Sequence, residues 1–141
     1  MKKLFYTLVV LLSFQTMGWT QFTAGGGAAY IFPGSGFGFQ AKSLIGINEN
    51  IDLSPSVGII LEDGTPFVLD VDLHYNLLNI GEDFRIMPFA GLNYVDGAGD
   101  NLGINLGFSF RFDVNTNTVY IEPKLTIISY GGMALAAGML F

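Results

Sequence analysis

The sequence predicts an all-β protein, an eight-stranded antiparallel up-and-down β-barrel that spans a membrane. Three observations lead to this prediction. Apolar and polar residues alternate through most of the chain, turn-forming clusters divide it into segments of about eight to twelve residues, and aromatic residues gather beside the turns. Alternation is the pattern of a sheet whose two faces meet different surroundings. Segments of this length suit tilted strands that cross a bilayer.

The composition excludes an ordinary soluble domain. Half of the 141 residues are hydrophobic and 13% are charged, whereas soluble domains carry roughly 25% charged residues. No apolar run of about 20 residues follows the N-terminal segment, which excludes a helical membrane protein. The chain has no cysteine, so disulfides and thiolate metal sites are excluded. Its net charge of −6 does not suit binding to nucleic acid, which requires a basic surface.

The N-terminus has the layout of a secretory signal peptide. Lys2 and Lys3 precede an apolar stretch that runs from Leu4 to Phe14. A short positive region followed by an apolar region of this length is typical of export signals. We therefore predict a signal peptide over residues 1–21, removed on export, and a barrel domain over residues 22–141.

Seven clusters of turn-forming residues divide the exported part, and seven turns join eight strands. The clusters are residues 33–36, 48–50, 62–66, 79–83, 96–101, 113–118 and 129–132.

The polar face of the alternating strands indicates which face lines the inside of the barrel. A soluble barrel would turn this face to water and would need dense charge there. Here the face holds few charges, of both signs, interleaved with glycines, which suits a narrow lumen where each ion needs a partner. We predict a luminal ion-pair network that plugs the barrel. Its members are Lys42, Asp52, Asp70, Asp72, His74, Arg85, Arg111, Glu122 and Lys124.

The aromatic residues predict two girdles, one at each membrane interface. Phe32, Phe37, Phe67 and Tyr94 flank alternate turns, while Tyr75, Phe84, Phe110, Phe112 and Phe141 flank the others.

A proline pattern recurs along the chain. The motif apolar-x-apolar-x-Pro ends at Pro55, Pro88 and Pro123, at intervals of about 34 residues. Proline removes a ladder hydrogen bond, so one interpretation is a repeated bulge or weakened register near one rim. Chance recurrence in a strand-rich chain is the other.

Together these features resemble the small outer-membrane β-barrel family, which includes the OmpA membrane domain and OmpX. The segments Pro55-Ser56-Val57-Gly58 and Pro88-Phe89-Ala90-Gly91 also resemble short barrel proteins of Bacteroidota. The resemblance implies a porin-like monomer in the outer membrane of a Gram-negative bacterium, surrounded by lipid, with periplasmic termini. It also implies that the terminal Phe141 is the assembly signal read by the barrel-assembly machinery.

The chain departs from the family in its presumed outer turns, residues 33–36, 62–66, 96–101 and 129–132, which are as short as the others. Family members that bind hosts, phage or partners use long loops. An adhesin or receptor role is therefore not expected.

Two clusters of polar residues could have a chemical function, one as a catalytic triad and the other as a metal site. His74 with Ser109 and the aspartates could form a hydrolase triad, but Ser109 lies two strands away, so we expect His74 to be a hydrogen-bonded luminal residue. Asp70 and Asp72 share a face about 7 Å apart and could bind Ca²⁺, although ion pairing is the stronger expectation. We predict no enzyme activity, no catalytic or metal site and no cofactor.

The leading hypothesis is a non-enzymatic barrel with a structural role in the cell envelope and a charge-plugged lumen. Small residues on the outer half of the luminal face also suggest a small vestibule for an apolar ligand. They are Gly27, Ala29, Gly38, Gly58, Ile60, Val68, Gly103, Ala134 and Ala136. A minor channel for small solutes and a lipid-modifying outer-membrane enzyme are the alternatives.

Overall fold

The computed structural model describes residues 22–32, 36–61, 66–96, 101–127 and 132–141. The predicted signal peptide, residues 1–21, and most of the presumed outer turns lie outside these ranges. The strands are β1 (Phe22–Phe32), β2 (Gly36–Gly46), β3 (Ile51–Ile60), β4 (Phe67–Tyr75), β5 (Leu78–Ile80), β6 (Phe84–Asp96), β7 (Asn101–Val114), β8 (Asn117–Ile127) and β9 (Gly132–Leu140). No helix among the described residues is long and apolar enough to cross a membrane.

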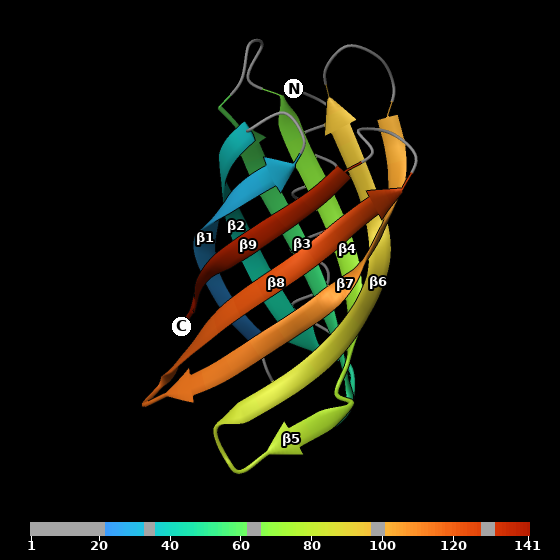
Figure 1. The fold of residues 1–141 in the computed structure, drawn as a ribbon. Helices are drawn as coiled ribbons and strands as arrows, with labels where there is room; N and C mark the ends of the chain where they lie inside the picture. The colour runs from blue at the N-terminus through green and yellow to red at the C-terminus, as the bar shows by residue number, and fades with distance from the viewer. Residues whose placement is uncertain (1–21, 33–35, 62–65, 97–100, 128–131) are drawn as a thin grey trace.

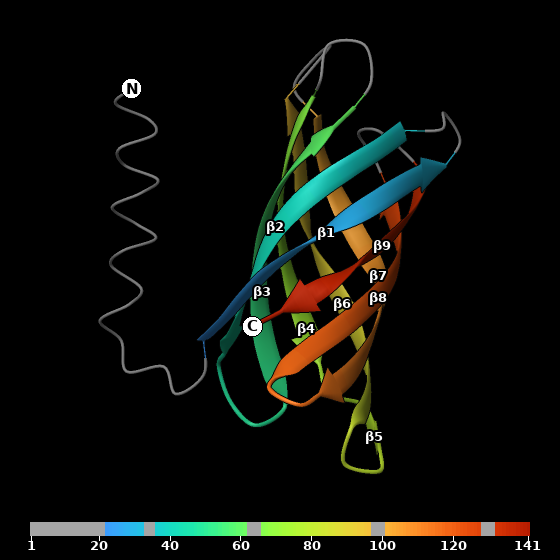
Figure 2. The ribbon, with the colours of Figure 1, turned by 90° about the vertical axis from the view of Figure 1, so that its left-hand side faces the viewer.

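The strands form one closed antiparallel barrel (Figure 1). Apart from β4 and β5, strands that are neighbours in sequence pair with each other, and β1 also pairs with β9, as Figure 2 shows from the side. Direct pairing of β4 with β6 completes the circle. The short β5 pairs only with β6, below the ring of eight strands. The predicted eight-stranded barrel is therefore confirmed. We call the end that carries residues 47–50, 81–83 and 115–116 the lower end, and the opposite end the upper end.

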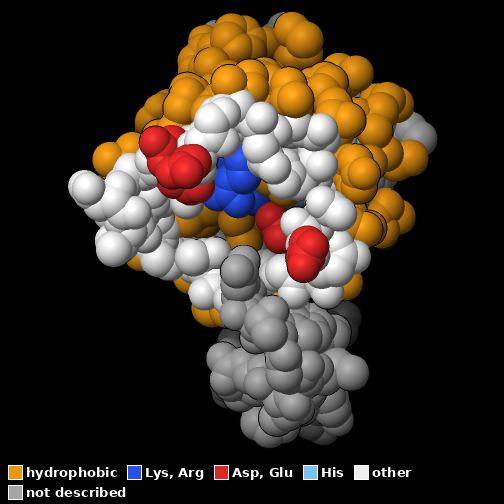
Figure 3. Space-filling view, turned by 90° about the horizontal axis from the view of Figure 1, so that it is seen from below, with side chains coloured by type: hydrophobic (Ala, Val, Ile, Leu, Met, Phe, Trp, Pro, Cys, Tyr) orange, Lys and Arg blue, Asp and Glu red, His pale blue; other side chains and the backbone are white. Residues whose placement is uncertain are grey.

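The alternation of the sequence becomes an alternation between lumen and surface. On β4, Asp70, Asp72 and His74 are buried, whereas the residues between them are exposed. The other strands repeat the pattern, so large aliphatic and aromatic side chains cover the outside. Figure 3 shows this apolar exterior surrounding a hollow that holds basic and acidic side chains. Among the described residues, buried apolar side chains form one small cluster, Leu44, Tyr120 and Leu140. The buried polar and charged residues, which include Lys42, Asp70, Asp72, Arg111 and Glu122, form what we call the polar core.

The turn predicted at residues 79–83 is wrong at its start. After His74 pairs with Phe89, the next pairing on this edge of β6 joins Leu78 to Ile86. Four steps along one strand therefore match three along the other, which is a one-residue bulge. The bulge shifts the alternation, so that Leu78 and Ile80 lie opposite the outward-facing Ile86 and Phe84. The turn itself shrinks to residues 81–83.

The three prolines do not share one structure. Pro88 lies where the β4–β6 pairing stops and the bulge begins. Beside Pro55 and Pro123 the ladder is interrupted on one side, and the register resumes unchanged. A missing N–H weakens the ladder without forcing an extra residue. The bulge is therefore not repeated: it occurs opposite Pro88 alone, while Pro55 and Pro123 interrupt the pairing, in line with the weakened register that the interpretation also named.

The predicted turn at residues 113–118 is also shorter than expected. Val114 pairs with Asn117, which leaves Asn115 and Thr116 as a two-residue hairpin loop. Asn115 has a φ of 58°, and asparagine tolerates this left-handed conformation better than most residues.

Candidate functional site: the barrel lumen

A chain of polar contacts crosses the lower half of the lumen, and Glu122 is its centre. One carboxylate oxygen of Glu122 forms an ion pair with the ammonium of Lys42. The other accepts a hydrogen bond from Ser109 Oγ at 2.7 Å. Arg111 Nε donates to the same Ser109 oxygen at 3.2 Å, and its Nη1 reaches Asp52 Oδ2 at 2.7 Å. The chain joins β2, β8, β7 and β3 through the interior, so the lumen is bridged between non-adjacent strands.

A second cluster lies above the first and is centred on Asp70. Lys124 Nζ donates to Asp70 Oδ2 at 2.7 Å. The amides of Asn93 and Asn105 donate to Asp70 Oδ1 at 2.5 and 3.0 Å, and Asn105 also donates to Asp72 Oδ1 at 3.1 Å. These contacts link β8, β6 and β7 to β4. Asp72 has no cation within ion-pair distance among the described residues.

The fourth ion pair sits at the lower rim. Arg85 Nη2 contacts both carboxylate oxygens of Asp113, at 2.8 and 3.0 Å. The two side chains are 31% and 32% exposed, in contrast to the inner pairs. Asp113 was assigned to a turn by sequence, although its alternation with Arg111 places it on the luminal face. With Asp113 included, the described lumen holds five acids against four bases, and this surplus matches the unpaired Asp72.

Tyr120 is fully buried inside the barrel beside Lys42 of the Glu122 chain, a role that the sequence did not indicate. Its hydroxyl accepts a hydrogen bond from Gln40 Nε2 at 3.0 Å, and the Lys42 ammonium lies 4.9 Å from the ring centroid. A Cβ atom added at Gly27 or Gly138 would lie 2.6 or 2.5 Å from the same hydroxyl. The carbonyl oxygens of Ala137 and Gly26 would lie closer still, at 2.2 and 2.3 Å. Glycine at these two positions therefore allows both the close approach of β1 to β9 and the placement of Tyr120.

His74 is not the hydrogen-bonded luminal residue that we expected. Its ring is buried against Phe89, with centroids 4.7 Å apart, because the register places the two residues directly opposite each other. No polar atom of the described residues bonds to either imidazole nitrogen. Ser109 lies on β7, two strands away, and its hydroxyl is already bound by Glu122 and Arg111. The triad of His74 and Ser109 is not assembled.

Metal binding finds no support in the described part of the chain, where no group of three or more His, Asp or Glu side chains could hold an ion. Asp70 and Asp72 instead share the amide of Asn105.

Two cavities lie above and below the polar core. The lower one, about 590 Å³, is a mostly polar mouth whose lining includes Arg85, Arg111 and Asp52; Figure 3 shows basic side chains inside this hollow. The upper cavity, about 90 Å³, has a floor of polar side chains that includes Asp70 and Lys124. Seven of the nine residues proposed for the vestibule line it, namely Ala29, Gly38, Gly58, Ile60, Val68, Ala134 and Ala136. Gly27 and Gly103 do not.

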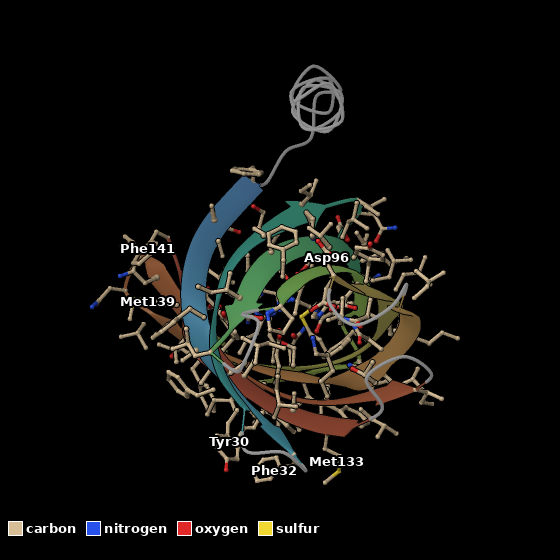
Figure 4. The ribbon with its side chains drawn as sticks, turned by 90° about the horizontal axis from the view of Figure 1, so that it is seen from above. Tyr30, Phe32, Asp96, Met133, Met139 and Phe141 are labelled. Atoms are coloured by element: carbon tan, nitrogen blue, oxygen red, sulfur yellow. The ribbon has the colours of Figure 1, made fainter. Side chains whose placement is uncertain are left out.

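The aromatic residues proposed for the girdles lie toward both ends of the outer surface. Phe32, Phe37 and Phe67 are exposed and Tyr94 is half-buried toward the upper end, while Tyr75, Phe84, Phe110, Phe112 and Phe141 lie lower. Phe84 stacks on Phe112 with centroids 4.6 Å apart. In Figure 4, Tyr30, Phe32 and Met133 point outward from the barrel wall, as do Met139 and Phe141. Phe22, Tyr30, Phe39 and Phe108 are further exposed aromatics that the girdle assignment omitted.

Phe141 lies just beyond β9 on the outer surface. Its backbone N–H donates to the Ala24 carbonyl at 2.8 Å, which extends the contact between β9 and β1. Phe141 is 68% exposed as a residue, whereas the preceding Leu140 is 1% exposed and belongs to the buried core.

Comparison with known proteins gives no match to any family model and none to a curated protein. Solved structures, in contrast, are similar over most of the chain. The N-terminal β-barrel domain of Pseudomonas aeruginosa OprF matches with a TM-score of 0.71 and 12% identity, over 84% of this chain and 93% of that one. A de novo designed transmembrane β-barrel matches with a TM-score of 0.68 and 12% identity, over 85% and 92% of the two chains.

A third similar structure is the outer membrane enzyme PagL, with a TM-score of 0.56 and 10% identity over 85% of this chain and 97% of that one. Natural, designed and enzymatic proteins thus share this architecture, and likeness of fold does not select a function among them. The chain has the fold of the small eight-stranded outer-membrane β-barrels.

Proposed function

We propose that this protein is an integral, monomeric outer-membrane barrel that is exported and cleaved, has a structural role in the envelope of a Gram-negative bacterium, and does not conduct solutes. The outer surface supports membrane residence. Large apolar side chains are exposed on all eight barrel strands, and a continuous surface of this kind matches lipid rather than water. By the family resemblance, the upper end faces the outside of the cell.

The chain of contacts centred on Glu122 is the main observation that supports a lumen closed to solutes. The side chains of Lys42, Glu122 and Arg111 are only 3%, 6% and 1% exposed, and they bridge the interior from opposite walls. A solute could pass only after these contacts break, and separating a buried charge from its partner is costly. Eight strands also enclose little room once side chains fill the interior.

Recordings of the purified protein in planar bilayers test this proposal. We expect no large steady conductance from the unaltered protein, because the buried contacts of Lys42, Glu122 and Arg111 bridge the lumen between non-adjacent strands. The double variant Lys42→Ala/Glu122→Ala should conduct more, whereas Asp113→Asn at the lower rim should not. Large steady conductance of the unaltered protein would favour the alternative of a minor solute channel.

The sequence-based alternative of a lipid-modifying enzyme agrees with the fold shared with the outer membrane enzyme PagL but is not favoured by the lumen. Ser109 is engaged by Glu122 and Arg111, and His74 contacts Phe89 instead of a hydroxyl. Mass spectrometry of outer-membrane lipids should show the same species with and without the gene. A lipid species that is lost on deletion and restored by the unaltered gene would overturn the structural role.

The proposal includes two finer assignments. Phe141 is the signal for the barrel-assembly machinery, as the resemblance implies, because it offers an exposed aromatic ring next to the β1–β9 seam. The upper cavity is a vestibule for a small apolar ligand, because its walls are mostly glycine, alanine and aliphatic side chains.

A further inference from the structure

We infer that the upper cavity binds one alkyl chain that ends in a hydroxyl group, and that this ligand comes from the surrounding lipid. The inference rests on the proposed function, since it takes the outer surface to lie in a membrane. It adds the chemistry of the ligand, the atoms that recognise its head and the side from which it enters.

The walls of the cavity select a narrow apolar chain. Ile31, Ile60, Val68 and Val95 contribute aliphatic side chains, and the remaining wall is mostly glycine and alanine. The volume of about 90 Å³ is smaller than a cavity of about 150 Å³ that holds benzene in an engineered protein. The enclosed part therefore suits a single alkyl chain better than an aromatic ring or a pair of chains.

Asn93 lines the cavity and carries a hydrogen-bond acceptor that has no partner among the described residues. Asn93 is 4% exposed, and its Nδ2 donates to Asp70. This contact fixes the orientation of the amide, because an ionised carboxylate can only accept. No donor among the described residues reaches the other amide atom, Oδ1. A buried acceptor of this kind needs a donor from outside the chain, either a water molecule or a ligand.

The same floor also carries a donor. Lys124 lines the cavity, and Asp70 is the only acceptor among the described residues that its ammonium contacts. An ammonium has three N–H donors. A hydroxyl group can donate to Asn93 Oδ1 and accept from Lys124. A carboxylate has no proton for Asn93 and would meet the Asp70 carboxylate, while an amine head would meet the Lys124 ammonium.

The cavity continues to residues that face the membrane. Its lining includes Phe32 and Met133, which pair across β1 and β9 and are exposed on the outer surface. Figure 4 shows both side chains pointing outward at the same part of the rim. Phe39 and Ile59, which pair across β2 and β3, are exposed in the same way and also line the cavity. A ligand with its head on the floor can therefore leave the rest of its chain in the lipid.

Photolabelling tests this inference, because adjacent residues of one strand face opposite sides. The protein is reconstituted in phosphatidylcholine vesicles with a 1-octanol analogue that carries a diazirine on its chain, and labelled residues are identified by peptide mass spectrometry. We expect saturable labelling of the luminal Val68 and Ala134, lost on addition of unlabelled 1-octanol but not of octane. Labelling of the outward Leu69 and Leu135 should persist, since these residues contact bulk lipid.

Matched variants separate the cavity from the surface. Val68→Phe fills the cavity and should abolish the luminal labelling, whereas Leu69→Phe adds the same ring to the outer face and should leave it intact. Labelling confined to outward residues, or unaffected by excess 1-octanol, would overturn the inference. If octanoate or octylamine reduced the luminal labelling as strongly as 1-octanol, the proposal that the ligand ends in a hydroxyl group would be overturned. The conductance of the same vesicles tests whether the barrel is closed to solutes. Failure of that proposal can therefore be distinguished from failure of the ligand proposal, which the labelling tests.

Discussion

Replacing Glu122 by glutamine removes one charge from the centre of the polar core and leaves its shape almost unchanged. The amide oxygen can still accept the hydrogen bond from Ser109, which now lies 2.7 Å from Glu122 Oε1. The Lys42 ammonium, 3% exposed, loses its only ion-pair partner among the described residues. Stranding one partner of a buried pair costs about 3–5 kcal/mol. A loss of this size is a large part of the 5–15 kcal/mol that typically separates folded and unfolded states.

Urea unfolding in phosphatidylcholine vesicles measures this loss. With an m-value of about 2 kcal/mol/M, the midpoint for Glu122→Gln should fall by about 2 M. The only tryptophan, Trp19, lies in the predicted signal peptide, so far-ultraviolet circular dichroism and electrophoretic mobility are the suitable probes.

Two further variants decide whether burial is the cause. Asp113→Asn strands Arg85 at the rim, where both side chains are about one-third exposed, and should cost at most about 1 kcal/mol. The double variant Lys42→Met/Glu122→Leu replaces the buried pair by apolar groups and should recover most of the stability. Equal losses for Glu122→Gln and Asp113→Asn, or a double variant as unstable as the single one, would refute the reasoning.

Three further predictions concern assembly, packing and a turn. Phe141→Asp should lower the yield of folded protein in cells, while the free energy of unfolding in vesicles should change by about 1 kcal/mol or less. Leu140→Ala should assemble normally but lose about 2–5 kcal/mol in the same urea titration. The reverse order would contradict the roles of Phe141 in assembly and of Leu140 in packing. Gly138→Ala should destabilise the barrel by about 1–3 kcal/mol, since its new Cβ would lie 2.3 Å from the Gly26 carbonyl oxygen on β1 and 2.5 Å from the Tyr120 hydroxyl, and an unchanged midpoint would exclude that close packing. Asn115→Val should cost about 1–2 kcal/mol at a φ of 58° while Asn115→Gly should not, and equal midpoints for these two variants would argue against the left-handed turn.

The strand count and the two faces could be predicted from sequence because both depend on the period-2 alternation. A strand that turns Asp72 inward must turn Leu73 outward, and this holds wherever the register is regular. The prediction failed where regularity breaks: the bulge after Tyr75 adds one residue and reverses the parity, so Leu78 and Ile80, not Asn79, continue the outer face. Nothing in the composition of that segment separates a bulge from a turn.

The partners within the lumen were harder to predict than its members. Lys42 and Glu122 lie on strands separated by β1 and β9, so their contact depends on how the closed barrel brings distant strands face to face. His74 illustrates the same limit. Its inward direction follows from alternation, but its contact with Phe89 follows from the β4–β6 register. Asn93 and Tyr120 have the parity of luminal residues, but the predicted network consists of charged residues and His74 and therefore includes neither.

Electrophoresis of boiled and unboiled protein from an outer-membrane fraction tests the central claim most directly. A closed barrel with an apolar exterior and a polar, ion-paired core should resist detergent until it is heated. We therefore expect the protein in the outer-membrane fraction, with two different mobilities before and after boiling. Identical mobility of protein recovered from the soluble fraction would contradict the account of an integral outer-membrane barrel.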